Sequence, residues 1–254
     1  MTGLSIHEPR TYRDFGPTDR FQAFRVVVET SDLYVRAHRV LQTETERLIR
    51  TCRAQIEDAI DRRPVFLKSL VPVEEDPADA PIVHRMIRAG KKAGTGPMAA
   101  VAGAVAEFVG QGLLARSPEL IIENGGDIFL KVAHPIVVGI LAGTSPFSGR
   151  LGIRVEPTGL PLGVCTSSGT VGPSLSSGTA EAATIISRDV ILADAVATAT
   201  GNRISHPRDL KGAVEWAMQV EGVDGAVAVT GEVIAALGNL ELVSLVEHEK
   251  EVKR

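Results

Sequence analysis

The sequence has few cysteines, few aromatic residues and no excess of positive charge. Its two cysteines, Cys52 and Cys165, lie far apart and have no second Cys or His at metal-ligand spacing, which argues against a disulfide framework and a zinc site. With a formal net charge of −4, the chain lacks the excess of basic residues that nucleic-acid-binding proteins have. Its aromatic content of 4 % is too low for a surface on which single-stranded bases stack. We therefore expect no nucleic-acid partner and a reducing, cytoplasmic compartment.

Long apolar runs are also missing. No stretch approaches the ~20 uncharged apolar residues that a membrane helix needs, and the sequence does not open with a basic segment followed by an apolar one. We expect a soluble protein without a membrane partner. With 254 residues, 44 % of them hydrophobic, the chain can bury a large core. We expect a single domain over residues 1–254, with an N-terminal hairpin and helices at 1–95, a core with the ligand motifs at 96–246 and a charged tail at 247–254.

Hydrophobic periodicity predicts a mixture of strands and helices. Alternating, β-branched segments predict strands at residues 21–30, 33–38, 120–123, 128–132, 136–142, 151–155, 162–165, 182–187, 225–230, 232–237 and 240–246, with a further short strand at 65–71. Apolar residues at helical spacing predict helices at residues 43–61, 80–93, 98–114, 190–200 and 208–220. The helix at 98–114 is rich in small residues and apolar on nearly every face, so we expect it in the interior.

A polar turn joins two of the predicted strands. It consists of Asn124, Gly125, Gly126 and Asp127. Two glycines permit positive φ or a close approach by a ligand, and Asn and Asp add side-chain acceptors. In isolation the motif favours an ordinary hairpin turn. The alternative, which the rest of the chain supports, is one wall of a ligand cleft.

The most unusual stretch of the chain is residues 166–179, which are almost entirely Gly, Ser, Thr and Pro. Such a composition suits a flexible linker. It also suits a cradle of hydroxyl and N–H groups for an anionic ligand. Strand-like segments flank it on both sides, where a linker between domains would be out of place, so we favour the cradle.

Asp194 and Thr198 lie four residues apart on the predicted helix at 190–200 and so project from one face. A carboxylate and a hydroxyl in this arrangement suit a hard divalent cation such as Mg²⁺, which completes its shell with water and substrate phosphate. Most such pairs are solvated or locally hydrogen-bonded instead. However, Asp194 lies among apolar neighbours, where a carboxylate needs a partner or a metal.

Three stretches together resemble the ApbE-like superfamily of FAD:protein FMN transferases, and above all its short cytosolic members in prokaryotes. The turn at residues 123–128 resembles the family's Asn-x-Gly-Gly-Asp-Ile element, residues 191–199 resemble its Ala-Asp-x-x-x-Thr helix, and residues 99–106 are similar to its Gly-Ala-x-Ala-Lys-Gly helix start. They occur in the family's order and cover roughly the C-terminal two-thirds of the chain. The resemblance implies a T-fold-like α+β domain with mixed or antiparallel sheets packed against helices.

The resemblance also implies a function. It implies FAD or another flavin nucleotide as ligand, Mg²⁺, and transfer of FMN to a Thr or Ser hydroxyl of a protein substrate. Asp194, Thr198 and the backbone carbonyl of Ala100 would hold the metal. The residues that would line the nucleotide are Asn124, Gly125, Gly126, Asp127, Thr166, Ser167, Ser168 and Gly169.

The sequence departs from the family pattern in two places. The family's His-x-x-Asp-Pro-x-Thr-Gly segment would fall between Gly169 and Thr184, where this chain has neither His nor Asp, and Gly103 replaces the Lys of the helix start. An alternative hypothesis is therefore a non-catalytic ligand-binding or partner subunit of another biosynthetic pathway. For either function the sequence leaves assembly into a homo-oligomer open. A nucleophilic role for Cys165 is a third hypothesis, although a buried free cysteine at a strand end is favoured.

Overall fold

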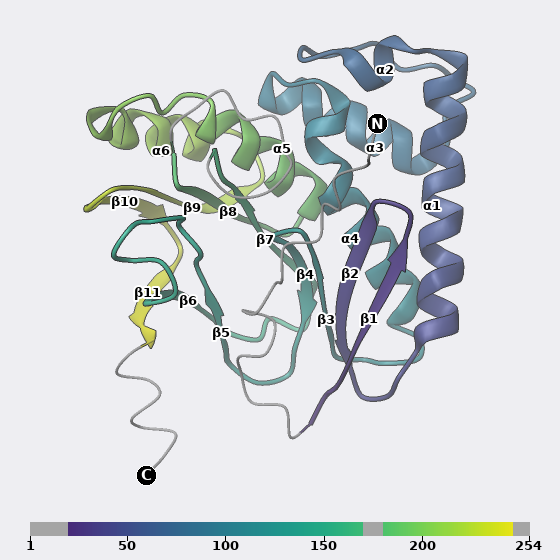
Figure 1. The fold of residues 1–254 in the computed structure, drawn as a ribbon, viewed down its shortest axis with the longest axis horizontal. Coiled ribbons are helices and arrows are strands. Elements are labelled where there is room, and N and C mark those ends of the chain that lie inside the picture. The colour runs from purple at the N-terminus through teal and green to yellow at the C-terminus, as the bar shows by residue number, and fades with distance from the viewer. Residues whose placement is uncertain (1–19, 170–179, 246–254) are drawn as a thin grey trace, which may run out of the picture.

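An antiparallel sheet of eight strands forms the centre of the protein. The computed structural model describes residues 20–169 and 180–245. The strands follow the order β1-β2-β3-β4-β7-β8-β9-β10, and every neighbouring pair is antiparallel (Figure 1). Their bounds are Gln22–Val28, Ser31–Ala37, Leu120–Asn124, Asp127–Lys131, Leu162–Ser167, Ala182–Ser187, Val223–Thr230 and Val233–Gly238. The sheet confirms the predicted hairpin at the N-terminal end and the strands around the Asn-Gly-Gly-Asp turn.

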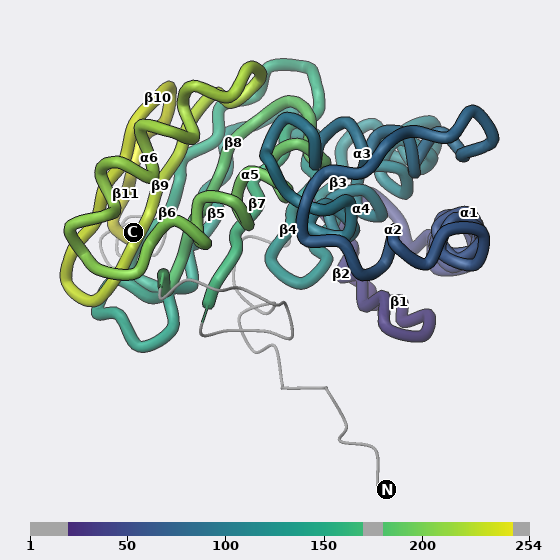
Figure 2. Tube along the Cα trace, turned by 90° about the horizontal axis from the view of Figure 1, so that it is seen from above, coloured from purple at the N-terminus to yellow at the C-terminus, as the bar shows by residue number. Residues whose placement is uncertain are grey.

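Six α-helices and two 3₁₀ turns accompany this sheet in the described chain. They are α1 (Gln42–Arg62), α2 (Val65–Lys68), α3 (Pro81–Ala93), η2 (Pro97–Ala100), α4 (Val101–Leu113), α5 (Val190–Gly201), η3 (Pro207–Asp209) and α6 (Leu210–Gln219). Figure 2 shows α1 to α4 gathered at the end of the sheet that carries β1 to β3, whereas α6 lies at the end formed by β9 and β10. The larger hydrophobic core joins these helices to the sheet.

A second, smaller sheet covers part of the other face. It has the order β11-β6-β5, with bounds Glu241–Ser244, Leu151–Val155 and Ile136–Gly139. Its inward side chains, such as Val138 and Ile153, form a separate apolar cluster with β4, β7, β8 and β9. The α+β class with antiparallel sheets packed against helices is therefore confirmed. No helix among the described residues is both long enough and apolar enough to cross a membrane.

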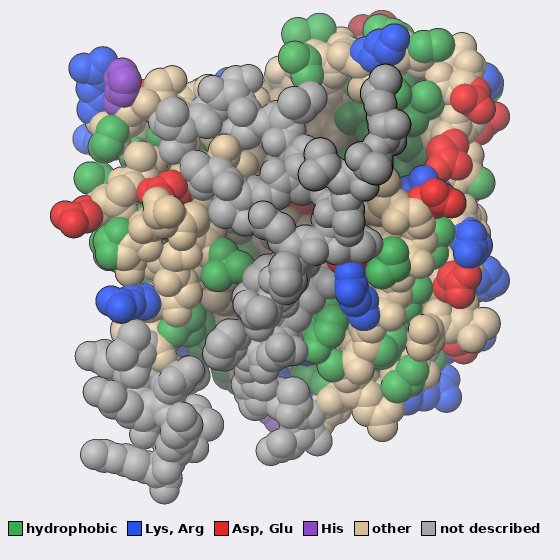
Figure 3. Space-filling model, in the orientation of Figure 1, with side chains coloured by type: hydrophobic (Ala, Val, Ile, Leu, Met, Phe, Trp, Pro, Cys, Tyr) green, Lys and Arg blue, Asp and Glu red, His purple; other side chains and the backbone are tan. Residues whose placement is uncertain are grey.

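The position of α1 follows from its amphipathic sequence. Its apolar side, which includes Ile49, Cys52 and Ile56, is buried. Its outer side carries ion pairs one helical turn apart, such as Glu46 with Arg50, so acidic and basic side chains alternate along this side of the molecule (Figure 3). Such exposed pairs each contribute about 0.3–0.5 kcal/mol.

The segment at residues 65–71 is not a strand. It forms the single helical turn α2 and then an irregular connection to the acidic loop. Phe66 is fully buried, but no neighbouring strand of the described chain offers backbone partners here. The apolar composition of the run therefore predicted the wrong element, because a short apolar segment does not distinguish strand from helix.

The chain from α3 to α4 shapes the interior of the fold. Gly94 ends α3 in the left-handed conformation, with φ at 72°, and Pro97 begins η2. The predicted helix at 98–114 thus starts as a 3₁₀ turn and continues as α4. Asp189 caps α5, as its side chain accepts a hydrogen bond from the N–H of Leu192 at 2.9 Å.

Candidate functional site

The Asn-Gly-Gly-Asp turn is a two-residue hairpin connection between β3 and β4. Asn124 pairs with Asp127 across the hairpin, and both glycines have positive φ, 72° at Gly125 and 115° at Gly126, as the tight turns of this class require. The Asn124 side chain donates a hydrogen bond from Nδ2 to the carbonyl of Ala102 at 3.0 Å. The turn is therefore both an ordinary hairpin and a contact with the first residues of α4.

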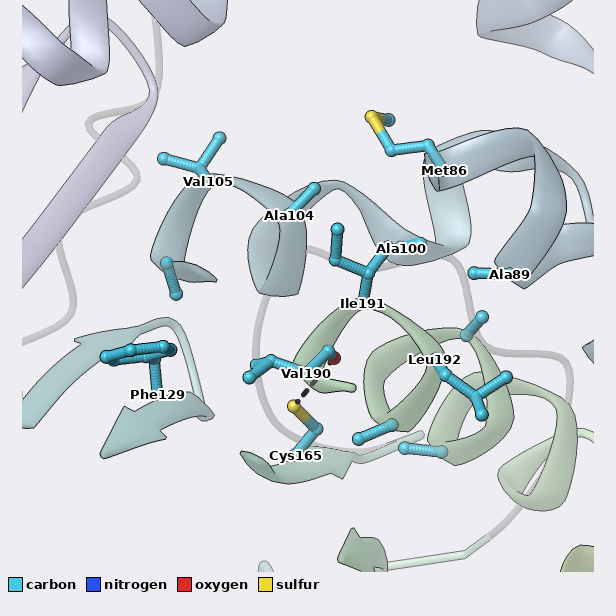
Figure 4. Packing of buried hydrophobic residues seen from close by; sticks show 14 of the residues in the cluster. Met86, Ala89, Ala100, Ala104, Val105, Phe129, Cys165, Val190, Ile191 and Leu192 are labelled. Atoms are coloured by element: carbon cyan, nitrogen blue, oxygen red, sulfur yellow. Dashed lines mark hydrogen bonds between the residues drawn. The ribbon is translucent and has the colours of Figure 1, made fainter. Parts of the chain in front are cut away.

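Helices α4 and α5 approach each other closely at Gly103. A Cβ on Gly103 would lie 2.7 Å from the carbonyl oxygen of Val190 and 2.8 Å from the Cβ of Asp194. Figure 4 shows Ala100 and Ala104 facing Ile191 across this contact. The small residues of the helix at 98–114 are thus explained by the approach of α5. No lysine can occupy position 103 without separating the two helices.

Each of these helices supplies an acceptor for the N-terminus of the other. Asp194 of α5 accepts a hydrogen bond at Oδ2 from the N–H of Gly103 at 2.8 Å. Glu107 of α4 accepts one at Oε2 from the N–H of Val190 at 3.0 Å. N–H groups in the first turn of a helix have no intrahelical acceptor, so the carboxylates satisfy donors that would otherwise be unpaired.

Arg85 of α3 completes the pairing of Glu107. Its guanidinium lies 2.9 Å from Oε1 of Glu107 and 3.0 Å from Oδ1 of Asp189. Burial nevertheless raises the pKa of Glu107, although Arg85 acts in the opposite direction. The sequence motifs did not indicate this ion pair. A Glu among the apolar and small residues of α4 was the signal that could have indicated it.

Asp127 and Asp194 form a second acidic cluster, together with Cys165. Cys165 lies opposite Asp127 on β7, and its Sγ lies 3.5 Å from the carbonyl oxygen of Val190 at the start of α5 (Figure 4). Both carboxylates are only 7 % exposed, and Cys165 is fully buried. Residues from β4, β7 and α5 thus meet beside the N-terminus of α4.

The two carboxyl groups of the cluster have no cationic side chain as a partner in the described chain. Among the described residues, neither Asp127 nor Asp194 forms an ion pair with Lys or Arg, in contrast to Glu107. Burial raises the pKa of Asp194 to about 7, opposed by hydrogen bonds from the N–H groups of Gly103 and Ala102. Burial, followed by the charge of Asp194, raises the pKa of Asp127 well above its usual value.

The same surroundings act on the thiol. Burial and the two neighbouring carboxylates raise the pKa of Cys165 well above its usual value. A nucleophilic cysteine requires the opposite, a lowered pKa and access to solvent. The structure therefore supports the buried role of Cys165 and gives no support to its role as a nucleophile.

The predicted metal ligands come from two adjoining elements. Ala100 ends η2, which packs against α5, and it is buried. Thr198 follows Asp194 by one helical turn and is half-buried. Within the described chain, no three side chains of His, Cys, Asp and Glu are grouped as a metal would require. Metal binding by a single carboxylate, a hydroxyl and a backbone carbonyl stays a prediction.

The end of β7 lies against the hairpin turn. The N–H of Thr166 donates to the carbonyl of Gly126 at 3.2 Å, and the Thr166 hydroxyl is 2.9 Å from that of Thr184 on β8. Ser167 and Ser168 are buried, and Gly169 donates its N–H to Ala180 at 2.9 Å. The Gly/Ser/Thr/Pro stretch therefore joins two adjacent strands of one sheet and is not a linker between domains. Its residues 170–179 lie outside the described part of the chain.

Comparison with known proteins decides the family. The sequence matches the family described as "AbpE bacteria" over residues 13–253, well over half of the chain. The chain belongs to this family. Relatives of this AbpE family member include a UPF0280 protein from Methanocella arvoryzae, 46 % identical over 205 residues that cover 79 % of this chain and 83 % of the relative. A UPF0280 protein from Methanosarcina acetivorans is 43 % identical over 205 residues, covering 78 % and 79 %.

Solved structures confirm the fold of this AbpE family member. It resembles a mutant of the flavin transferase ApbE from Vibrio cholerae with a TM-score of 0.54 at 10 % identity, covering 86 % of this chain and 97 % of that one. The ApbE protein from Thermotoga maritima matches with a TM-score of 0.51 at 16 % identity, covering 92 % and 99 %. At these identities the likeness establishes the ApbE-like fold alone.

Proposed function

We propose that the protein binds a phosphate-bearing flavin nucleotide, principally FAD, together with a divalent cation. The proposal includes transfer of the FMN half of FAD to a hydroxyl of a protein substrate. The observation that carries it is the pair of buried carboxylates, Asp127 and Asp194, which have no cationic side chain beside them in the described chain. Buried carboxylates of this kind are costly unless a cation or a proton compensates them.

The donor atoms suit a hard cation. Asp194, the hydroxyl of Thr198 and the carbonyl of Ala100 would hold Mg²⁺ through oxygen alone, and the remaining positions would be available to water and phosphate. When bound, the cation would neutralise charge on the pyrophosphate of FAD. Asp127 lies beside Asp194, and a bound cation would favour the ionised form of both carboxyl groups, whose pKa values burial raises in its absence.

Two segments that meet at the ends of the central strands β3, β4 and β7 would position the nucleotide. These are the hairpin turn, with Asn124, Gly125, Gly126 and Asp127, and the end of β7, with Thr166, Ser167, Ser168 and Gly169. In the transfer, the acceptor oxygen would form a bond to the phosphorus of the FMN half while the bond from that phosphorus to the bridging oxygen breaks. AMP would leave with that oxygen, and the hydroxyl proton would pass to solvent water. In such reactions the protein mainly positions the groups.

A second function is favoured by the sequence between Gly169 and Thr184. This interval has neither the His nor the Asp of the family's segment. The same fold and site would then serve a non-catalytic ligand-binding or partner subunit of another pathway. For either function we place the protein in the cytoplasm, because both cysteines are free.

Calorimetry with FAD tests the site, with and without Mg²⁺. Wild type should bind FAD more tightly with Mg²⁺, and Asp194→Asn should lose that dependence. Asp224→Asn, an exposed aspartate at the start of β9, is the matched control and should behave as wild type. Identical Mg²⁺-dependent binding by Asp194→Asn and wild type would refute the site.

Covalent transfer separates the two functions. Wild type is incubated with FAD, Mg²⁺ and a flavoprotein whose flavin-accepting residue is a threonine, and the acceptor is examined for in-gel fluorescence and mass. A mass increase equal to one FMN, with release of AMP, supports the transferase. Mg²⁺-dependent FAD binding without any transfer supports the non-catalytic subunit.

A further inference from the structure

The segment at residues 65–71 exposes apolar side chains that the fold does not use. Val65, Leu67, Leu70 and Val71 are 56 %, 48 %, 75 % and 64 % exposed. We call these four side chains the 65–71 patch. Figure 3 shows hydrophobic side chains around a basic one over α2, at the top of the molecule. Exposed apolar residues are normal when scattered singly, whereas a contiguous group marks an interaction site.

The patch is held in a fixed place. Phe66 inserts into the core with no exposed surface, and the Ser69 hydroxyl donates to the carbonyl of Val71 at 2.6 Å. The backbone of Ser69 lies directly on Gly96, where a Cβ would come within 1.8 Å of the Ser69 carbonyl oxygen. A glycine is therefore required at position 96 for this contact. The apolar side chains project from an ordered scaffold and not from a free loop.

This anchoring places the patch near the proposed cation site. Gly96 immediately precedes η2, whose last residue is Ala100. Four residues at ~2.0 Å rise separate Gly96 from Ala100 by about 8 Å. A protein that covers ~800 Å² of its partner spans roughly 30 Å. A protein seated over the proposed site from the side of α2 would therefore reach the patch.

The charges around the patch indicate what it would bind. Arg62 and Arg63 pair with Asp79, and Glu75 pairs with Arg88. Lys68, within the segment, is exposed and forms no ion pair with any described residue. The patch thus combines four apolar side chains with one available positive charge. A second copy of this chain, related by a two-fold axis through the patch, would bring two Lys68 side chains together, and the repulsion of their like charges would weaken binding.

We propose that the 65–71 patch is the docking surface for the protein that carries the flavin-accepting hydroxyl. The matching surface of that protein is apolar and includes an acidic side chain that pairs with Lys68. This proposal rests on the proposed function, because it assigns the protein substrate of the same site. It adds a location and a recognition chemistry that the transfer reaction itself does not specify.

Steady-state transfer kinetics test the docking surface, with the full chain, FAD, Mg²⁺ and the purified threonine-bearing acceptor flavoprotein. Leu70→Ser combined with Val71→Ser should raise KM for the acceptor about tenfold and leave kcat and FAD affinity unchanged. Lys68→Glu should raise the same KM, and the increase should shrink at high salt. Leu160→Ser is the matched control, since Leu160 is 52 % exposed and lies in the β6–β7 connection. Circular dichroism melts should be alike for all variants.

Each outcome decides the docking proposal separately from the transferase. Transfer with an unchanged KM in both patch variants overturns the docking surface and leaves the transferase standing. If wild type binds FAD but transfers nothing, the transferase fails, and acceptor binding is measured directly by calorimetry. Acceptor binding that the patch variants weaken tenfold then supports docking, whereas no acceptor binding overturns it. A wild-type dimer that the patch variants dissociate, seen by light scattering, also overturns it.

Discussion

Replacing Asp194 by Asn should stabilise the cation-free protein at high pH. Asn has nearly the same shape as Asp and carries no charge. The structure places this carboxylate beside Asp127 in a buried cluster, and burial raises its pKa from 3.8 to about 7. The folded state therefore binds the proton more tightly than the unfolded chain does. The stability contributed by the protonated form is present below the unfolded pKa and is lost as the pH rises through about 7.

The magnitude follows from the pKa shift. A change from 3.8 to about 7 is roughly three pKa units, equivalent to about 4 kcal/mol of unfolding free energy between pH 4 and pH 8. The neutral amide of Asn accepts the N–H of Gly103 less strongly, which costs about 1 kcal/mol. At pH 8 without divalent cations, Asp194→Asn should then exceed wild type by about 1–3 kcal/mol. At pH 5 the two proteins should differ by less than about 1 kcal/mol.

Urea unfolding at pH 5 and pH 8, in EDTA and in Mg²⁺, measures these differences. Mg²⁺ should stabilise wild type at pH 8 with release of protons, and it should not stabilise Asp194→Asn. If the Asp194 carboxylate served only as a hydrogen-bond acceptor for the N-terminus of α4, its replacement would lower the unfolding free energy equally at both pH values. An equal loss of stability in Asp194→Asn at both pH values, with no effect of Mg²⁺ on wild type, would refute the reasoning.

Two further predictions concern the packing around the cluster. Gly103→Ala should lower the unfolding free energy by about 1–3 kcal/mol, because the added Cβ would overlap Val190 and Asp194. Gly212→Ala on α6 should raise it by about 0.5–1 kcal/mol, because an added Cβ there has no neighbouring atom within 4 Å and alanine favours the helix. Thermal melts of both variants measure these changes. A destabilising Gly212→Ala or a neutral Gly103→Ala would contradict this. Cys52 and Cys165 should not react with a thiol reagent at pH 7.5 until the protein unfolds, because both are buried and burial raises the pKa of each thiol. Fast labelling of either cysteine in the folded protein would show that its thiol is not buried.

The elements that local patterns define were predictable from the sequence. The helices α1 and α3 have apolar residues at helical spacing, and Gly94, Pro97 and Asp189 mark ends of elements through their backbone and capping chemistry. The hairpin at Gly125 and Gly126 followed from the same local rules. The segment at 65–71 was mistaken for a strand, because no local pattern shows whether a neighbouring strand is available to pair with it.

What the tertiary structure alone decided is which residues meet. The sequence identified Asp194 as a carboxylate in need of a partner, and it identified Asp127 as part of a turn. Only the antiparallel order of β4 and β7 and the close approach of α4 and α5 at Gly103 bring Asp127, Cys165 and Asp194 into one buried cluster. Contacts between residues far apart in the sequence depend on sheet order and helix packing, which local periodicity does not encode. The same reason explains why the reciprocal pairing of Glu107 with Val190 became visible only in the folded chain.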